Sequence, residues 1–108
     1  MIDFEKTEKK VMPNFYGGDK EYRASMFTDE MNKIMKGVLI PGASIGFHKH
    51  ETSSEIIFFL SGKGKVILED GEERVEAGLC HYCRKGSSHS LVNDGDEDLI
   101  FYAVVPQQ

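Results

Sequence analysis

Short runs of β-forming residues alternate with glycine-containing turns along most of the chain. The runs cover residues 22–27, 38–40, 44–47, 56–60, 65–69, 72–75, 79–83, 89–92 and 99–105. Turn signals separate them, among them Pro41-Gly42, Asp70-Gly71 and Asn93-Asp94-Gly95. Many short strands with turns about every 8–12 residues are typical of an all-β sandwich or barrel. We therefore predict an all-β fold, with a two-residue hairpin turn at Asp70-Gly71.

Residues 31–40 carry a pattern that fits two kinds of structure. Four apolar residues recur at the helical spacing i, i+3, i+4 and i+7, namely Met31, Ile34, Met35 and Val38. Gly37 and the β-branched run that follows it favour a turn and a strand instead. We predict a strand from about Lys33 onward.

Composition narrows the class of protein. The chain has 108 residues, 13 basic and 18 acidic side chains, and a formal net charge of −5. This length and an apolar content of 40% fit one domain, 1–108, with an N-terminal arm or strand at 1–20 and a barrel at 21–108. The acidic balance argues against a nucleic-acid partner, and no apolar run reaches the roughly 20 residues of a membrane span. The polar start is unlike a signal peptide, so we expect a cytoplasmic protein.

The two cysteines have the C-x-x-C spacing of redox motifs. The segment Cys80-His81-Tyr82-Cys83 lies between Gly78 and Gly86, which favours a strand over the start of a helix. Residues three apart on a strand point to opposite faces, so we expect two reduced thiols. A redox role stays the alternative.

Three of the four histidines belong to one pattern. His48 and His50 are two residues apart, which places both imidazoles on the same face of a strand. Glu55 opens the next apolar run, and His89 follows a later glycine-containing turn. Three imidazoles and one carboxylate suit a divalent transition metal with open positions for substrate. The alternative is a histidine-rich strand that binds no metal.

With these residues in place, the sequence resembles the cupin superfamily. The first cupin motif, G-x5-H-x-H-x3–4-E-x6-G, is matched by Gly42, His48, His50, Glu55 and Gly62. The second, G-x5-P-x-G-x2-H-x3-N, is matched by Gly78, Gly86, His89 and Asn93, whereas Arg84 stands at the usual proline position. Nine positions at fixed intervals over about half the chain make a specific match.

The resemblance implies a conserved jelly-roll barrel, the cupin double-stranded β-helix, with a metal inside its mouth. It assigns His48, His50, Glu55 and His89 as the ligands of one divalent transition metal. A mixed nitrogen and oxygen site does not choose among Zn, Fe, Mn, Ni and Cu.

Strand alternation then separates inner from outer residues. If His48 faces inward, Ile45 and Phe47 face outward; if Glu55 faces inward, so do Ile57 and Phe59, whereas Ile56, Phe58 and Leu60 face outward. The strand at 56–60 is thus apolar on both faces, and a cover is expected over the outward residues Ile45, Phe47, Ile56, Phe58 and Leu60. We expect a homodimer across this face, as is common for small cupins. The alternative is that the N-terminal 20 residues fold back over it.

We expect a small-molecule ligand in an apolar pocket. The pocket candidates are Ile57, Phe59, Leu91, His81 and Tyr102. The leading hypothesis is a metalloenzyme of dioxygenase, isomerase, decarboxylase or lyase type. No acidic residue beyond Glu55 can be placed in the pocket by alternation, so a non-catalytic ligand- or metal-binding protein stays the alternative. Oxalate decarboxylation is disfavoured, because the sequence offers no second domain and no obvious acidic lid near the site.

Overall fold

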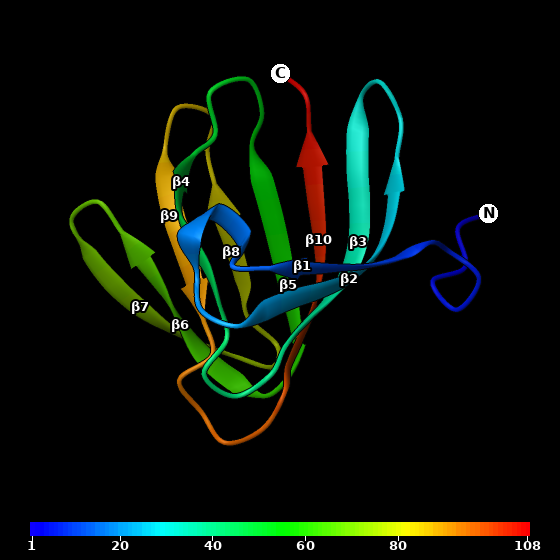
Figure 1. Ribbon diagram of the computed structural model, residues 1–108. Coiled ribbons are helices and arrows are strands. Elements are labelled where there is room, and N and C mark those ends of the chain that lie inside the picture. Colours follow the sequence, from blue (N-terminus) through cyan, green and yellow to red (C-terminus); the bar gives the residue numbers. More distant parts are fainter.

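The computed structural model describes residues 1–108 as two facing antiparallel sheets (Figure 1). The six-stranded sheet contains, in spatial order, β1 (Lys9–Pro13), β2 (Glu21–Thr28), β3 (Asn32–Leu39), β10 (Leu99–Pro106), β5 (Glu55–Ser61) and β8 (Cys80–Cys83). The four-stranded sheet contains β4 (Ser44–Lys49), β9 (Ser88–Val92), β6 (Lys63–Leu68) and β7 (Gly71–Glu76). The all-β, jelly-roll prediction is confirmed. The chain contains no helix with the length and apolar character needed to cross a bilayer.

The core lies between the two sheets as one cluster of 15 buried apolar residues. Leu39, Leu99 and Phe101 are completely buried in it. They come from the neighbouring strands β3 and β10, where Leu39 pairs with Leu99 and Gly37 with Phe101. Packing on the inner faces of β3 and β10 therefore stabilises the centre of the six-stranded sheet. The other inward-facing side chains of this sheet project from the same face.

The structure confirms most of the predictions made for individual segments and shifts the position of one turn. Residues 32–39 form strand β3, as predicted, rather than a helix. The hairpin between β6 and β7 is present, but Leu68 pairs with Gly71, so Glu69 and Asp70 form the two-residue turn. Gly71 opens β7 with a φ of 152°, one position later than the predicted turn requires. Cys80 is exposed and Cys83 is buried on β8, and both are free thiols, as predicted.

Simple alternation fails on β4. The pairing of β4 with β9 shifts register between Ile45 and His48. Such an irregularity inserts an extra residue and reverses which side chains face inward. Ile45 is therefore buried in the core, contrary to its predicted outward direction, and Phe47 is exposed.

A strap formed by residues 14–20 joins β1 to β2 and contains the single 3-10 turn, Phe15–Gly17. Asn14, Tyr16 and Lys20 all have positive φ, an uncommon conformation for residues other than glycine. The strap docks on β4: the Asp19 amide donates to Oγ of Ser44 at 2.8 Å. A Cβ atom at Gly46 would collide with the carbonyl oxygen of Tyr16, so this close approach requires glycine.

The outer face of β5 is apolar and exposed, as alternation predicts. Ile57 and Phe59 are buried, whereas Phe58 and Leu60 point away from the core into solvent. The N-terminal segment covers only part of the neighbouring surface, where the Phe4 ring stacks on Tyr102 at 5.5 Å between centroids.

Candidate metal centre

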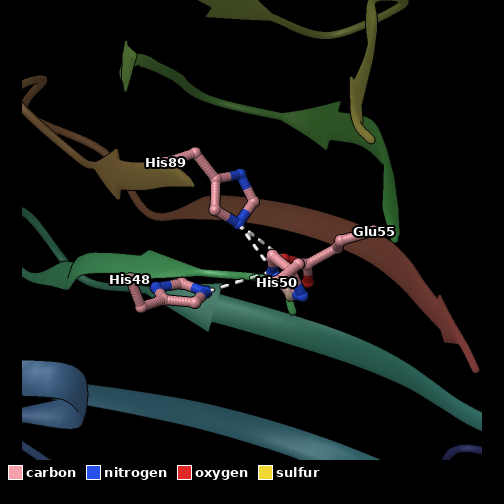
Figure 2. A group of neighbouring side chains, drawn as sticks. All are labelled: His48, His50, Glu55 and His89. Carbon is pink, nitrogen blue, oxygen red and sulfur yellow. Dashed lines mark hydrogen bonds and ion pairs between the residues drawn. The ribbon is translucent and has the colours of Figure 1, made fainter. Parts of the chain in front are cut away.

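Four side chains of types that bind metals converge inside the barrel (Figure 2). His48 lies on β4 and His50 directly follows that strand, whereas His89 lies on β9 and Glu55 opens β5. The antiparallel pairing of β4 with β9 sets His48 opposite His89. Glu55 comes from the other sheet. The cluster therefore forms only when the two sheets face each other.

The potential ligand atoms are close together. Nε2 of His50 lies 3.2 Å from Nε2 of His48 and 3.0 Å from Nε2 of His89. Oε1 of Glu55 lies 2.9 Å from Nε2 of His89 and 3.3 Å from Nε2 of His50. His89 and Glu55 are buried, whereas His48 and His50 are half-buried. The cluster is thus accessible from the side of His48 and His50.

Each imidazole is held at its other nitrogen. Nδ1 of His48 donates to the carbonyl oxygen of Gly46 at 2.7 Å, and Nδ1 of His50 lies 3.1 Å from Oγ of Ser53. Nδ1 of His89 lies 2.9 Å from Nε2 of His81. Anchoring of one ring nitrogen by a neighbouring group orients the other nitrogen toward a metal. All three rings therefore present Nε2 to the centre of the cluster.

His81 is the unusual anchor, because it is itself an imidazole. Burial, together with the neighbouring His89, lowers the pKa of His81 to about 4. The ring is consequently neutral near pH 7, and its Nε2 can accept the proton on Nδ1 of His89. This direction of donation leaves the Nε2 lone pair of His89 free to bind a metal.

The carboxylate is ionised. Burial alone would raise the pKa of Glu55, but the hydrogen bonds with His50 and His89 outweigh it and bring the pKa to about 2. Burial lowers the pKa of His48, against the opposing effect of its bond to Gly46. Metal binding requires an ionised carboxylate and unprotonated imidazole nitrogens, and the pKa shifts of Glu55 and His48 both lie in that direction.

The four residues fit a divalent transition metal. Ligand atoms about 2.1 Å from an ion and at right angles to each other lie about 3.0 Å apart. The separations of 2.9–3.3 Å among the paired atoms match this value. With their Nε2 atoms unprotonated, the three imidazoles and the carboxylate oxygen place several electron pairs against one another, an arrangement that a cation stabilises. The cluster can therefore hold a metal ion.

A cavity of about 320 Å³ adjoins the cluster. His48, His50 and Glu55 form part of its wall. The remaining lining residues come from the strap, the inner faces of both sheets, the β4–β5 loop and the C-terminal end: Phe15, Tyr16, Tyr22, Met26, Lys33, Met35, Ile45, Lys49, Glu51, Thr52, Ser53, Val105 and Gln107.

None of the five predicted pocket residues lines this cavity. Ile57, Phe59 and Leu91 face inward as expected, but they are packed in the core. Tyr102 lies on the outer face of β10, because buried Phe101 and Ala103 on either side of it take the inward direction. His81 touches the cluster through His89 rather than through the cavity.

Sequence reasoning missed several residues at the cavity. Glu51 lines it from the β4–β5 loop, where strand alternation does not apply, so alternation could not place this second acidic residue at the cavity. The Tyr16 ring stacks on His48 with centroids 4.1 Å apart and an angle of 10° between planes. No pattern signals this contact, since it depends on the left-handed conformation of Tyr16 in the strap.

Comparisons with known proteins find several relatives of similar sequence. The chain is 43% identical over 68 residues to an oxalate-binding protein of Thermotoga maritima, covering 62% of this chain and 55% of that protein. It is 30% identical over 95 residues to an oxalate decarboxylase of Bacillus subtilis, covering 81% of this chain and 25% of that protein. It is also 37% identical over 65 residues to a glucose-6-phosphate isomerase of Pyrococcus horikoshii, covering 56% and 34% respectively. The matches thus span between a quarter and about half of these relatives.

Solved structures extend the likeness to the whole chain. A crystal structure described as a predicted oxalate decarboxylase of Thermotoga maritima superposes with a TM-score of 0.92 at 27% identity, covering 100% of this chain and 99% of that one. A cupin 2 conserved barrel domain protein of Salinispora arenicola gives a TM-score of 0.78 at 23% identity, covering 99% and 87%. The family model of the cupin domain matches residues 36–105, which include all four cluster residues. The chain therefore belongs to the cupin family.

Proposed function

We propose that this cupin binds one divalent transition metal through His48, His50, Glu55 and His89 and acts on a small organic molecule in the adjoining cavity. The supporting observation is the convergence of three Nε2 atoms on an ionised carboxylate, with each Nδ1 held by a neighbour. When bound, such a metal supplies a Lewis acid for substrate oxygens. The residues of the chain orient the ligand atoms and shape the cavity.

Metal content tests the first half of this proposal. Protein purified without chelator and loaded with Zn, Mn, Fe, Ni or Cu should retain about one ion per chain by elemental analysis. Glu55→Gln should lower the retained metal strongly, because the anionic ligand is lost. Glu51→Gln is the matched control, since it alters a nearby exposed carboxylate outside the cluster and should keep the metal. Folded wild-type protein that retains none of these metals would overturn the proposal.

Catalysis is favoured by the acidic residue in the β4–β5 loop. Glu51 is exposed and lines the cavity beside the cluster, a position from which it can exchange a proton with a bound molecule and with water. The relatives are named for oxalate binding, oxalate decarboxylation and sugar-phosphate isomerisation. We accordingly propose an enzyme of the decarboxylase, isomerase, lyase or dioxygenase type.

Turnover separates this enzyme from a non-catalytic binding protein. Metal-loaded protein should convert a member of a panel that includes oxalate, a sugar phosphate and aromatic hydroxy acids. Glu51→Gln should then slow conversion with the metal content unchanged. Saturable binding of panel members without any conversion would instead support a binding protein.

We also propose that two copies pair through the outer face of the six-stranded sheet. Phe58, Leu60 and Tyr82 lie together on β5 and β8 and are 41–53% exposed. An apolar group of this kind on a monomer marks an interaction surface. The Phe4 contact with Tyr102 leaves these three residues uncovered.

Light scattering should give a dimeric mass at micromolar concentration. Phe58→Lys should shift that mass toward the monomer. Phe47→Lys is the matched control, because Phe47 is an equally exposed aromatic residue on the other sheet, and it should stay dimeric. A monomeric wild-type protein would exclude the dimer.

A further inference from the structure

The cavity beside the metal cluster has two chemically different ends. One end is formed by His48, His50 and Glu55. Of the other thirteen wall residues six are polar and seven are apolar or aromatic, namely Phe15, Tyr16, Tyr22, Met26, Met35, Ile45 and Val105. A volume of about 320 Å³ lies at the lower limit for sites that enclose organic molecules of roughly drug size. The space thus extends well beyond what two directly bonded carboxylates would fill.

The cavity wall lacks the arginine that would suit two-point binding of a small dianion. No arginine lines it. Arg23 pairs with Glu21, Arg74 pairs with Asp94, and the Arg84 guanidinium lies over the ring of Tyr82. Planar two-point recognition of a carboxylate is the particular strength of arginine. The two lysines at the wall, Lys33 and Lys49, are exposed to solvent.

The apolar wall carries one underused hydrogen-bond donor. Tyr22 is 2% exposed, and its hydroxyl bonds to the thioether sulfur of Met35 at 3.0 Å. Thioether sulfur is a weak acceptor, so an oxygen of a bound molecule would be a better partner. Burial raises the pKa of the Tyr22 hydroxyl, so it stays protonated as a donor.

The strap determines how this wall is built. Phe15 packs against the core and is 5.6 Å from the Tyr22 ring, whereas Tyr16 lies flat on His48. The strap is held on β4 where Gly46 and Gly18 leave no room for a side chain. Aromatic rings from the strap therefore extend the apolar wall as far as the metal-ligating residues.

Resting on the metal site proposed above, we propose that the cavity selects organic ligands with a chelating oxygen head and an apolar, ring-sized body. The head lies at His48, His50 and Glu55, and the body lies against the strap and the two methionines, Met26 and Met35. Tyr22 donates to an oxygen of the ligand. A two-carbon dianion such as oxalate lacks the body and leaves this wall without contacts.

A matched pair of chelators tests the selection. Acetohydroxamate and benzohydroxamate share one chelating head and differ in a methyl against a phenyl group. Calorimetric titration of the Zn-loaded protein should show benzohydroxamate binding about ten- to a hundredfold more tightly, because the ring is buried against apolar side chains. Oxalate should bind more weakly than benzohydroxamate. Elemental analysis after each titration checks that the chelator has not removed the metal.

Substitutions test whether the apolar side chains of the cavity wall cause the preference for the phenyl group. Met26→Lys places a charge beside the bound ring and should reduce the advantage of the phenyl group to less than threefold, with the Zn content unchanged. Tyr102→Ala removes an aromatic residue of the outer face and should leave the advantage intact. If Met26→Lys does not fold, methyl NMR of the wild type replaces it. Benzohydroxamate should then shift the methyl signals of Met26 and Met35 and leave that of exposed Met31 unchanged.

Failure of the ligand selection and failure of the metal site would give different results. Normal Zn content with equal binding of the two hydroxamates, or with oxalate binding more tightly than benzohydroxamate, would overturn the selection and leave the metal site standing. Absence of Zn from the folded protein would overturn the metal site and the selection together.

Discussion

The two ends of the barrel use buried polar groups in opposite ways. At the end formed by the β3–β4 and β9–β10 connections, Asn93 is completely buried and all its side-chain atoms are bonded. Its Nδ2 donates to the carbonyl oxygens of Leu39 and Glu97, each at 2.7 Å, and its Oδ1 accepts from the Gly95 amide at 3.0 Å. At the other end, the imidazoles and Glu55 turn their polar atoms toward one another and toward a cavity.

This difference separates structural from functional residues within one motif. His89 and Asn93 are four positions apart in the second cupin motif, and spacing alone does not assign their roles. The side-chain amide of Asn93 is hydrogen-bonded to backbone groups, so its role is to stabilise the fold. His89 has one nitrogen anchored and the other facing ligand atoms, so it is available to a metal.

The largest expected effect is at the structural end. Asn93→Ala would remove the side-chain partner of one buried carbonyl oxygen, one part-buried carbonyl oxygen and one part-buried amide, which should lower the free energy of unfolding by about 3–4 kcal/mol. Urea unfolding measures this loss. Ser90→Ala is the matched control, because it removes one buried hydrogen bond, to the carbonyl oxygen of Ile45, and should cost about 1 kcal/mol. Equal losses in the two variants would contradict the structural role of Asn93, as would loss of metal from the folded Asn93→Ala protein.

Regular strands could be predicted from the sequence because alternation acts locally. On β5, Ile57 and Phe59 are buried while Phe58 and Leu60 are exposed, as the period of two requires. The same holds for the choice of a strand at residues 32–39, where β-branched residues outweigh a helical spacing of four apolar side chains.

Features that depend on two segments at once could not be predicted. The register shift that buries Ile45 is a property of the β4–β9 pair, not of β4 alone. The strap has positive φ at Asn14, Tyr16 and Lys20, where the sequence offers no glycine as a signal. Its position follows from contacts with Ser44 and Gly46, which lie 25 and 30 residues away from their strap partners Asp19 and Tyr16 in the chain.

The cluster itself was predicted by motif spacing, but its surroundings were not. His48, His50, Glu55 and His89 come together as the cupin resemblance implies. Alternation gave no position for Glu51, which lies in a loop, and it left His81 undecided between a core residue and a neighbour of the site. The contact of His81 with Nδ1 of His89 joins strands β8 and β9, which belong to different sheets.

A smaller effect is expected from His81, the half-buried anchor of the metal end. His81→Ala removes the acceptor for Nδ1 of His89 and should weaken metal binding about 10- to 100-fold. His81→Gln retains an acceptor oxygen and should recover most of this loss. Competition with a chromophoric chelator measures both affinities. An unchanged affinity in His81→Ala would show that His89 needs no anchor, and an equal loss in His81→Gln would show that the imidazole acts through something other than acceptance.

The smallest effect is expected from the anchor in the β4–β5 loop, at Ser53. Ser53→Ala removes the hydroxyl that lies 3.1 Å from Nδ1 of His50. Because His50 is half-buried, water can replace the hydroxyl, so metal affinity should fall only about two- to tenfold, or about 0.5–1.5 kcal/mol. Thr52→Ala is the matched control: its hydroxyl bonds to Gln107 rather than to a ligand, and it should leave the affinity unchanged. A loss in Ser53→Ala as large as that in His81→Ala would mean that the exposure of the anchored imidazole does not set the strength of its anchor, since the His50 side chain is 10% exposed and the His89 side chain only 2%.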